Sequence, residues 1–197
     1  DGKRIIDTWE HLIDPKQPIP PEITLLTGIT NEMVLGQPML EDLAQDLNEF
    51  IGNSALLGHF VRFDLSFLNR AGIGQYNQVI DTFEMAAVLL PSASRYSLAA
   101  LGYILGLPHG SLHRAMEDTK LTHNVYIKLY EKSLALPVSL LAEIVRWGRN
   151  TNWEGTWIFE QILNARSQVG ISETPLQLDQ FQAFQISSQD EHDPLVP

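Results

Sequence analysis

Short apolar runs alternate with segments of helical periodicity along the middle of the chain, and this alternation limits the possible folds more than any other feature of the sequence. Residues 54–58 and 78–81 are such runs, and each predicts a short buried strand. Each run is followed by a segment whose apolar residues recur three and four positions apart, which predicts a helix. Strands that alternate with helices predict an α/β fold built around a central sheet.

The other elements of this α/β region follow from the same two periodicities. Residues 3–13 alternate between polar and apolar side chains, which predicts another strand. Helices are expected at residues 22–26, 39–51, 62–71, 82–90, 97–105 and 114–132, with one more short helix capped by Thr30 or Asn31.

The pattern changes after Pro137, where only helices are expected. Apolar spacing predicts two of them, at residues 138–147 and 153–166, while the chain from about Gly170 is polar and lacks periodicity. We therefore divide the chain into an α/β domain at residues 1–135, a helical connector at 136–168, and a linker or disordered tail at 169–197. In the plainest interpretation, the connector is a two-helix hairpin with Trp147, Trp153 and Trp157 as its core.

The formal net charge of −11 argues at first against a nucleic-acid partner, because phosphate binding depends on Lys and Arg. The charge is unevenly spread, however. Five acidic residues and no basic ones lie between Gly170 and Pro197, so the rest of the chain carries −6. Bound divalent cations invert the local field of an acidic protein, so the composition is compatible with a metal-dependent nuclease.

Several classes of protein are excluded by what the sequence lacks. No run of about 18 uncharged apolar residues occurs, so no membrane span is expected. No cysteine occurs, which excludes disulfides and thiolate metal sites and fits a cytoplasmic location. The phosphate-binding pattern Gly-x-x-x-x-Gly-Lys-Ser/Thr is also absent, so no helicase activity is expected from these residues.

A carboxylate stands where an expected buried strand gives way to a helix. Asp64 lies at this junction, six residues after Gly58. Phe63, Phe67 and Leu68 are expected to anchor the helix behind it. Open α/β sheets bind ligands beyond the carboxyl ends of their strands, so Asp64 is a candidate site residue. The structural alternative is an acidic residue that only stabilises the helix dipole.

A second candidate pair lies further along the chain. His113 precedes the long helix expected at residues 114–132, and Asp118 lies just over one turn inside that helix. This spacing lets a loop histidine and a helix carboxylate approach one site. Carboxylate oxygens suit hard divalent cations, and a histidine beside them can act as a general base. Seen alone, such a pair is better explained by a loop histidine and a solvated helix carboxylate.

Five segments in the same order resemble the DnaQ-like DEDDh 3′–5′ exonucleases, a DNA polymerase III epsilon-like family. They are Leu26–Thr30, the pattern His-x-x-x-Phe-Asp that runs from His59 to Asp64, Val79–Thr82, Tyr96–Leu98, and the pattern His-x-Ala-x-x-Asp that runs from His113 to Asp118. The resemblance covers residues 3–132. It implies an RNase H-like fold with a mixed central sheet and flanking helices, followed here by a C-terminal helical extension.

The resemblance also implies a chemistry and a set of site residues. The expected reaction is hydrolysis of the phosphodiester at the 3′ end of single-stranded DNA or another nucleic acid, with two Mg²⁺ or Mn²⁺ ions in the complete site. Asp64 and Asp118 would hold metal, and His113 would act as the base. The expected substrate contacts are Thr27, Gly28, Ile29, His59 and Phe60. Asp81 we expect to be structural, capping the helix that follows it.

Two departures from the family pattern stand out. The first motif of the family, Asp-x-Glu on an opening strand, has no counterpart in the sequence. We expect that this strand is missing from the chain, that Asp64 and Asp118 alone bind metal weakly, and that the chain is inactive as it stands. The second departure is Phe60, where the family has Asn. This change replaces an amide by a ring beside the expected cleft.

The helical extension has a resemblance of its own. Residues 136–144 and 153–166 are similar to the connector in exonuclease–helicase fusions of the DinG type. This implies a helicase domain in the same parent chain and favours DNA as the substrate. One alternative from another class stays open, a non-catalytic exonuclease-fold module for interaction or scaffolding, which the acidic charge and Phe60 favour.

Overall fold

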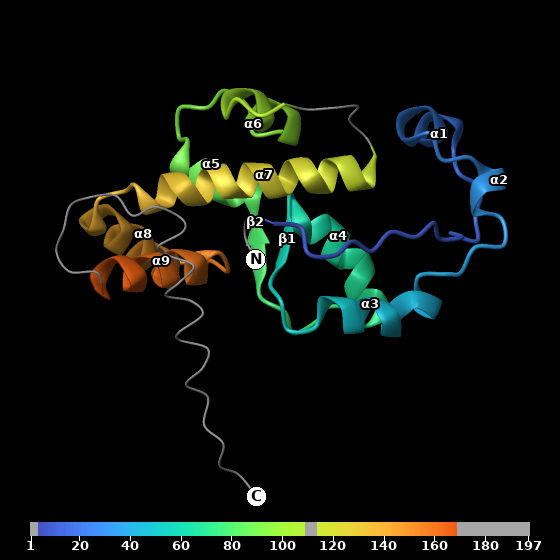
Figure 1. The fold of residues 1–197 in the computed structure, drawn as a ribbon, viewed down its shortest axis with the longest axis horizontal. Coiled ribbons are helices and arrows are strands. Elements are labelled where there is room, and N and C mark those ends of the chain that lie inside the picture. Colours follow the sequence, from blue (N-terminus) through green and yellow to red (C-terminus); the bar gives the residue numbers. More distant parts are fainter. Residues whose placement is uncertain (1–3, 109–113, 169–197) are drawn as a thin grey trace, which may run out of the picture. The chain divides into compact units, whose positions relative to one another are not determined.

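The computed structural model describes residues 4–108 and 114–168, and Figure 1 traces the chain through them. The chain divides into two compact units, residues 1–127 and residues 128–197. His113 and the tail predicted at residues 169–197 lie outside the described residues. Within the described ranges, no helix is both long enough and apolar enough to cross a membrane.

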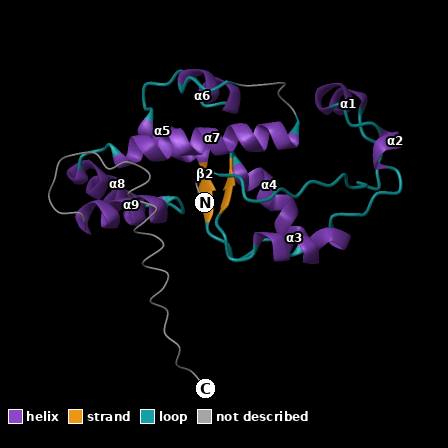
Figure 2. Cartoon of the chain, viewed as in Figure 1, coloured by secondary structure: helices purple, strands orange, loops and turns teal. Residues whose placement is uncertain are grey.

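The sheet of the first unit is a parallel pair of strands, β1 (Leu56–Gly58) and β2 (Val79–Asp81), shown as arrows in Figure 2. Leu56 pairs with Val79, and Gly58 pairs with Asp81. Both strands were expected from their apolar runs, and both are confirmed. The described residues add no antiparallel strand to the pair, so the expected mixed sheet is represented here by its parallel part.

The strand predicted at residues 3–13 is wrong for the part that the structure describes. Residues 4–13 run as irregular chain. A strand exists only where a second strand completes its hydrogen-bond ladder, and no such partner occurs among the described residues. The segment keeps the alternating composition of a strand, with the apolar side chains of Ile5 and Ile6 exposed.

The helices of the first unit lie close to their predicted ranges. They are α1 (Pro21–Thr27), α2 (Asn31–Val34), the 3₁₀ helix η1 (Glu41–Leu43), α3 (Ala44–Ile51), α4 (Val61–Leu68), the 3₁₀ helix η2 (Asn69–Ala71), α5 (Thr82–Leu89), α6 (Leu98–Ile104) and the long α7 (Ala115–Leu134), which contains the boundary between the units.

Capping residues explain why several of these helices begin and end where they do. The Thr30 side chain accepts a hydrogen bond from the Met33 N–H and starts α2, and the Ser97 side chain accepts one from the Ala100 N–H and starts α6. Gly72 ends η2 in the left-handed conformation, with φ of 74°. Each of these signals is visible in the sequence, which is why the helix boundaries could be predicted.

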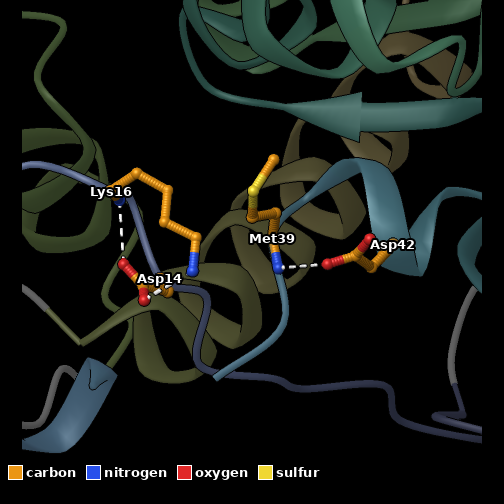
Figure 3. A network of polar contacts seen from close by, with 4 residues as sticks. All are labelled: Asp14, Lys16, Met39 and Asp42. Atoms are coloured by element: carbon orange, nitrogen blue, oxygen red, sulfur yellow. Dashed lines mark hydrogen bonds and ion pairs between the residues drawn. The ribbon is translucent and has the colours of Figure 1, made fainter. Parts of the chain in front are cut away.

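Polar contacts tie the segment after residue 13 to the segment before η1. The Asp14 N–H donates to the Pro38 carbonyl at 2.9 Å. Figure 3 shows the two neighbouring turns: Lys16 Nζ lies 2.8 Å from the Asp14 carboxylate, and the Met39 N–H donates to the Asp42 carboxylate at 2.9 Å. The hydrogen bond from Lys16 lowers the pKa of Asp14. These local bonds hold residues 14–16 and 39–42 in place where no strand pairing does so.

The core of the first unit gathers around the two strands and the helices that follow them. Its most deeply buried side chains are Ile73, Thr82, Met85, Ala86, Leu101 and Val125. Because α5 begins directly after β2 and is packed into this core, its position relative to the strand is fixed.

The second unit contains a hairpin of α8 (Val138–Asn150) and α9 (Thr156–Gln168). Its core consists of Leu141, Val145, Ile158, Phe159 and Ile162. The expectation of a tryptophan core is wrong, because Trp147 is 59% exposed, while Trp153 and Trp157 are only half-buried. The aliphatic residues at helical spacing fill the interface instead.

Candidate functional site

The ends of β1 and β2 place matching residues of the two following segments side by side. Since Gly58 pairs with Asp81, the next residues, His59 and Thr82, are also neighbours: His59 Nδ1 lies 2.9 Å from Thr82 Oγ1. The Thr82 hydroxyl in turn donates to the Gly58 carbonyl at 3.1 Å. A hydrogen bond between the residues that follow the two strands therefore lies at the carboxyl edge of the sheet, where α/β folds bind ligands.

Asp81 fastens the beginnings of two helices to this edge. One carboxylate oxygen accepts the N–H groups of Phe60 at 3.1 Å and Phe83 at 2.8 Å, and the other accepts the N–H of Val61 at 3.1 Å. The residue is 9% exposed. Its predicted capping of the following helix is confirmed. The bond to α4, which the sequence did not predict, makes Asp81 the link between the two helix starts.

Phe60 occupies an unusual backbone conformation at this point. Its φ of 56° and ψ of 41° lie in the left-handed region, which is an uncommon conformation for a bulky residue and one in which Asn is enriched. Gly58, two residues earlier, is also constrained, because a Cβ atom there would overlap the Val61 side chain. The sharp turn from β1 into α4 therefore depends on a small residue at 58 and a strained one at 60.

The rings that follow the two strands stack on each other. Phe60 and Phe83 each stand two residues beyond a paired strand end, and their ring centroids are 4.1 Å apart with planes 28° from parallel. Phe83 also meets Tyr96 edge-on at 5.7 Å. Sequence reasoning missed this stack, although the expected strand ends at Gly58 and Asp81 would have placed both rings at the same offset.

His59 packs beside the Phe60 and Phe83 rings, and its pKa is lowered. Burial lowers the pKa of His59, while the Asp81 carboxylate and the Tyr96 carbonyl oppose that shift. Its Nε2 atom is buried and has no hydrogen-bond partner within the described part of the chain. The planes of the His59 and Phe60 rings are nearly perpendicular, and their centroids are 5.3 Å apart. Burial therefore favours the uncharged form of the His59 ring, which packs beside Phe60.

Asp64 projects from the first turn of α4, as predicted. Its side chain is exposed, and partial withdrawal of water around the carboxyl raises the pKa of Asp64, with the Asp81 charge adding to the effect. Two of the three predicted anchors are wrong: Phe63 is 69% and Phe67 48% exposed, and their rings contact each other. The third, Leu68, is half-buried. Asp64 therefore stands on a solvent-facing helix surface beside the strand ends.

Asp118 lies in the first turn of α7 and is half-buried. Its N–H donates to the Arg114 carbonyl at 2.9 Å, which starts the helix. The structure thus places both predicted carboxylates in the first turns of helices. Within residues 4–108 and 114–168, no group of three or more histidine and carboxylate side chains is close enough to hold a metal ion.

The segment Thr27–Gly28–Ile29 forms a tight corner at the end of α1. The Thr27 hydroxyl donates to the Ile23 carbonyl at 2.8 Å and accepts the Ile29 N–H at 3.2 Å, and Gly28 is left-handed with φ of 74°. A Cβ atom at Gly28 would lie 3.5 Å from the Arg114 guanidinium. The fold therefore brings Arg114, four residues before Asp118, to this distant corner, and Figure 1 shows α1 near the beginning of α7. The proximity of Arg114 carried no signal in the sequence.

Comparison with known protein families identifies the family to which this arrangement belongs. A family model described as "Exonuclease" matches residues 1–126. The chain belongs to the exonuclease family. The match includes both strands, Asp64, Asp118 and the corner at Gly28, so the strand ends described above are part of an exonuclease fold of the RNase H-like α/β type.

Curated relatives agree with this assignment. DNA polymerase III subunit epsilon of Aquifex aeolicus is 34% identical over 137 residues, which are 67% of this chain and 68% of that protein. The 3′-5′ exonuclease DinG of Bacillus subtilis is 28% identical over 169 residues, which are 83% of this chain but 18% of that protein. The chain is thus homologous to both proteins, and its match covers only a small part of the DinG protein.

A solved structure shows the same fold. Exonuclease X, in a complex with 5′ overhanging duplex DNA, superposes with a TM-score of 0.54 and 29% sequence identity. The superposition covers 66% of this chain and 75% of the exonuclease X chain. The predicted family and its α/β fold are therefore confirmed.

Proposed function

We propose that this chain provides a 3′–5′ exonuclease domain that acts on DNA 3′ ends with divalent metal ions. The observation that carries the proposal is the exonuclease-type carboxyl edge of the sheet, where α4 brings Asp64 out beside the paired ends of β1 and β2. The names of the relatives support a 3′–5′ direction and DNA as substrate.

The metal-holding residues would be Asp64 and Asp118. Their oxygen donors are of the kind that Mg²⁺ and Mn²⁺ prefer. A bound ion would supply charge stabilisation at the scissile phosphate and acidify water. His113 is proposed to take the proton of the attacking water. Because the pKa of Asp64 is raised, protons compete with a cation for this carboxylate, and metal binding is expected to weaken as the pH falls.

Two carboxylates are few for a two-metal site. The sequence contains no Asp-x-Glu, the motif that supplies the other two in the family it resembles. We therefore propose that the 197 residues bind metal weakly and do not cut DNA by themselves. The substrate would be held by Thr27, Gly28 and Ile29 at the corner near Arg114, and by Phe60, with His59 set behind the ring.

The partners follow from the relatives. We propose single-stranded DNA, or the 3′ end of another nucleic acid, as the substrate, and a helicase domain in the same parent chain, since the match to DinG extends beyond the exonuclease region to 83% of this chain.

Digestion of a 5′-labelled single-stranded DNA tests the proposal. The 197-residue chain would be compared with a chimera that carries, at its N-terminus, the opening strand of the Aquifex epsilon subunit. We expect shortening from the 3′ end by the chimera in Mn²⁺, none by the chain alone, and loss of cutting in the chimera with His113→Ala or Asp118→Asn.

A chimera that is folded but neither cuts DNA nor binds Mn²⁺ by calorimetry would contradict the proposal. That outcome would leave the alternative, a non-catalytic exonuclease-fold module for interaction or scaffolding. Restored cutting with unchanged activity in His113→Ala would instead contradict the role of His113 alone.

A further inference from the structure

We propose that the outer face of the Phe60 ring is a stacking site for an unpaired nucleobase. This inference rests on the proposed function, because it names how the same site holds a nucleic-acid strand. It goes beyond that function in giving the base, and not only the phosphate, a defined position on the protein.

The geometry of the ring suits a flat ligand. Phe83 covers one face of Phe60 at a centroid distance of 4.1 Å, and His59 touches it edge-on at 5.3 Å, yet Phe60 remains 52% exposed. With one face and one edge covered, the exposed surface includes the opposite face. Aromatic side chains present such faces to single-stranded nucleic acids, and every base has a matching π-face.

The backbone holds this ring in place at a cost. A left-handed conformation is unfavourable for Phe, and strained residues persist only where their surroundings determine them. Here the surroundings are the Asp81 carboxylate, which accepts the Phe60 and Val61 N–H groups, and the stack on Phe83. The ring is therefore fixed in advance, so little freedom is lost when a base stacks on it.

The position fits a strand that reaches the candidate site. Phe60 is the N-cap of α4, and Asp64 lies one turn further along the same helix. A base on Phe60 thus lies within the reach of one nucleotide from the carboxylate proposed to hold metal. The substrate contact predicted at Phe60 would therefore be base stacking. The Asn that the family has at this position could offer only hydrogen bonds.

Charge also favours a base contact. Even without the acidic stretch after Gly170 the chain carries −6, so general attraction to phosphates is weak, and contacts that do not depend on counterion release contribute a larger share of the affinity. Stacking is such a contact. We therefore expect binding of a single strand to depend on its bases and to change little with salt concentration.

The test uses the full 197-residue chain and two probes of equal length, an oligothymidylate octamer and the same backbone with abasic sites. Binding is measured by fluorescence anisotropy, and the Phe ring signals by ¹³C NMR. We expect tighter binding of the octamer than of the abasic probe, with an upfield shift of the Phe60 ring. Phe60→Asn should weaken octamer binding about tenfold without changing abasic binding, while Phe60→Trp should retain it.

The matched control is Phe67→Ala, which removes an aromatic ring of similar exposure, 48%, from α4, the helix that Phe60 precedes. This variant should leave octamer binding unchanged. The inference is overturned if Phe60→Asn binds the octamer like the original chain, if both probes bind equally, or if neither binds. Cutting by the chimera together with any of these results would reject the stacking site alone. Base-dependent binding through Phe60 with an inactive chimera would reject the proposed activity alone.

Discussion

The backbone N–H of Phe60 and the Oδ1 atom of Asp81 lie 3.1 Å apart, and this bond joins the segments that follow two neighbouring strands. The same oxygen accepts the N–H of Phe83, and the second oxygen accepts that of Val61. One buried carboxylate thus sets the starting points of α4 and α5. The position of Asp64, in the first turn of α4, depends on it.

Removing the Asp81 carboxylate should destabilise the first unit strongly. Asp81→Ala leaves three N–H groups without their acceptor, and hydrogen bonds to a charged group are worth more than neutral ones. We expect the free energy of unfolding, measured in urea, to fall by about 3 kcal/mol. The control is Ser97→Ala, which removes the single exposed cap of α6 and should cost about 1 kcal/mol. Equal losses in the two variants would show that Asp81 acts only as an ordinary cap.

The conformation of Phe60 should reverse the usual order of alanine and glycine. Both Phe60→Ala and Phe60→Gly remove the ring, but only glycine adopts the left-handed conformation without steric cost. We expect the Gly variant to be more stable than the Ala variant by about 1 kcal/mol. At Phe67, inside α4, the order should be opposite by a similar amount, because glycine is unfavourable in a helix. Thermal unfolding of the four variants checks both halves, and an Ala advantage at position 60 would contradict the strain.

The lowered pKa of His59 should make the stability of the first unit depend on pH. The folded-state pKa of His59 lies below its ordinary value of 6.5, because burial disfavours the charged ring. Below pH 6.5 the unfolded chain therefore binds a proton that the folded chain does not, and stability falls as the pH drops from 6.5 toward the folded-state pKa. His59→Asn keeps a donor near Thr82 but cannot titrate, so its urea midpoint should fall less over this window. An identical fall in both proteins would place the pH dependence elsewhere.

The sequence predicted the elements better than the contacts among them. Caps such as Thr30 and Ser97 and the apolar runs at β1 and β2 are local signals, so the helices and both strands were predictable. Residues 3–13 were predicted as a strand because their side chains alternate in polarity, but a strand requires a partner. The Phe60–Phe83 stack and the Arg114–Gly28 contact join residues far apart in the chain. Both contacts result from strand register and helix packing, which cannot be read from the sequence until the fold is known.

The hairpin of the second unit should depend on the absence of a side chain at Gly148. In α8, a Cβ atom at this position would overlap the side chain of Thr156, which starts α9. Thr156 has little room to move, because it is buried and its hydroxyl donates to the Trp153 carbonyl. Gly148→Ala should therefore lower the free energy of unfolding by about 2 kcal/mol, as overpacking does, even though alanine is the better helix former. Ser139→Ala, on the exposed surface of α8, is the control and should change stability little. If chemical denaturation found Gly148→Ala more stable than the original chain, helix propensity would outweigh the overlap with Thr156. The proposed requirement for glycine at position 148 would then be wrong.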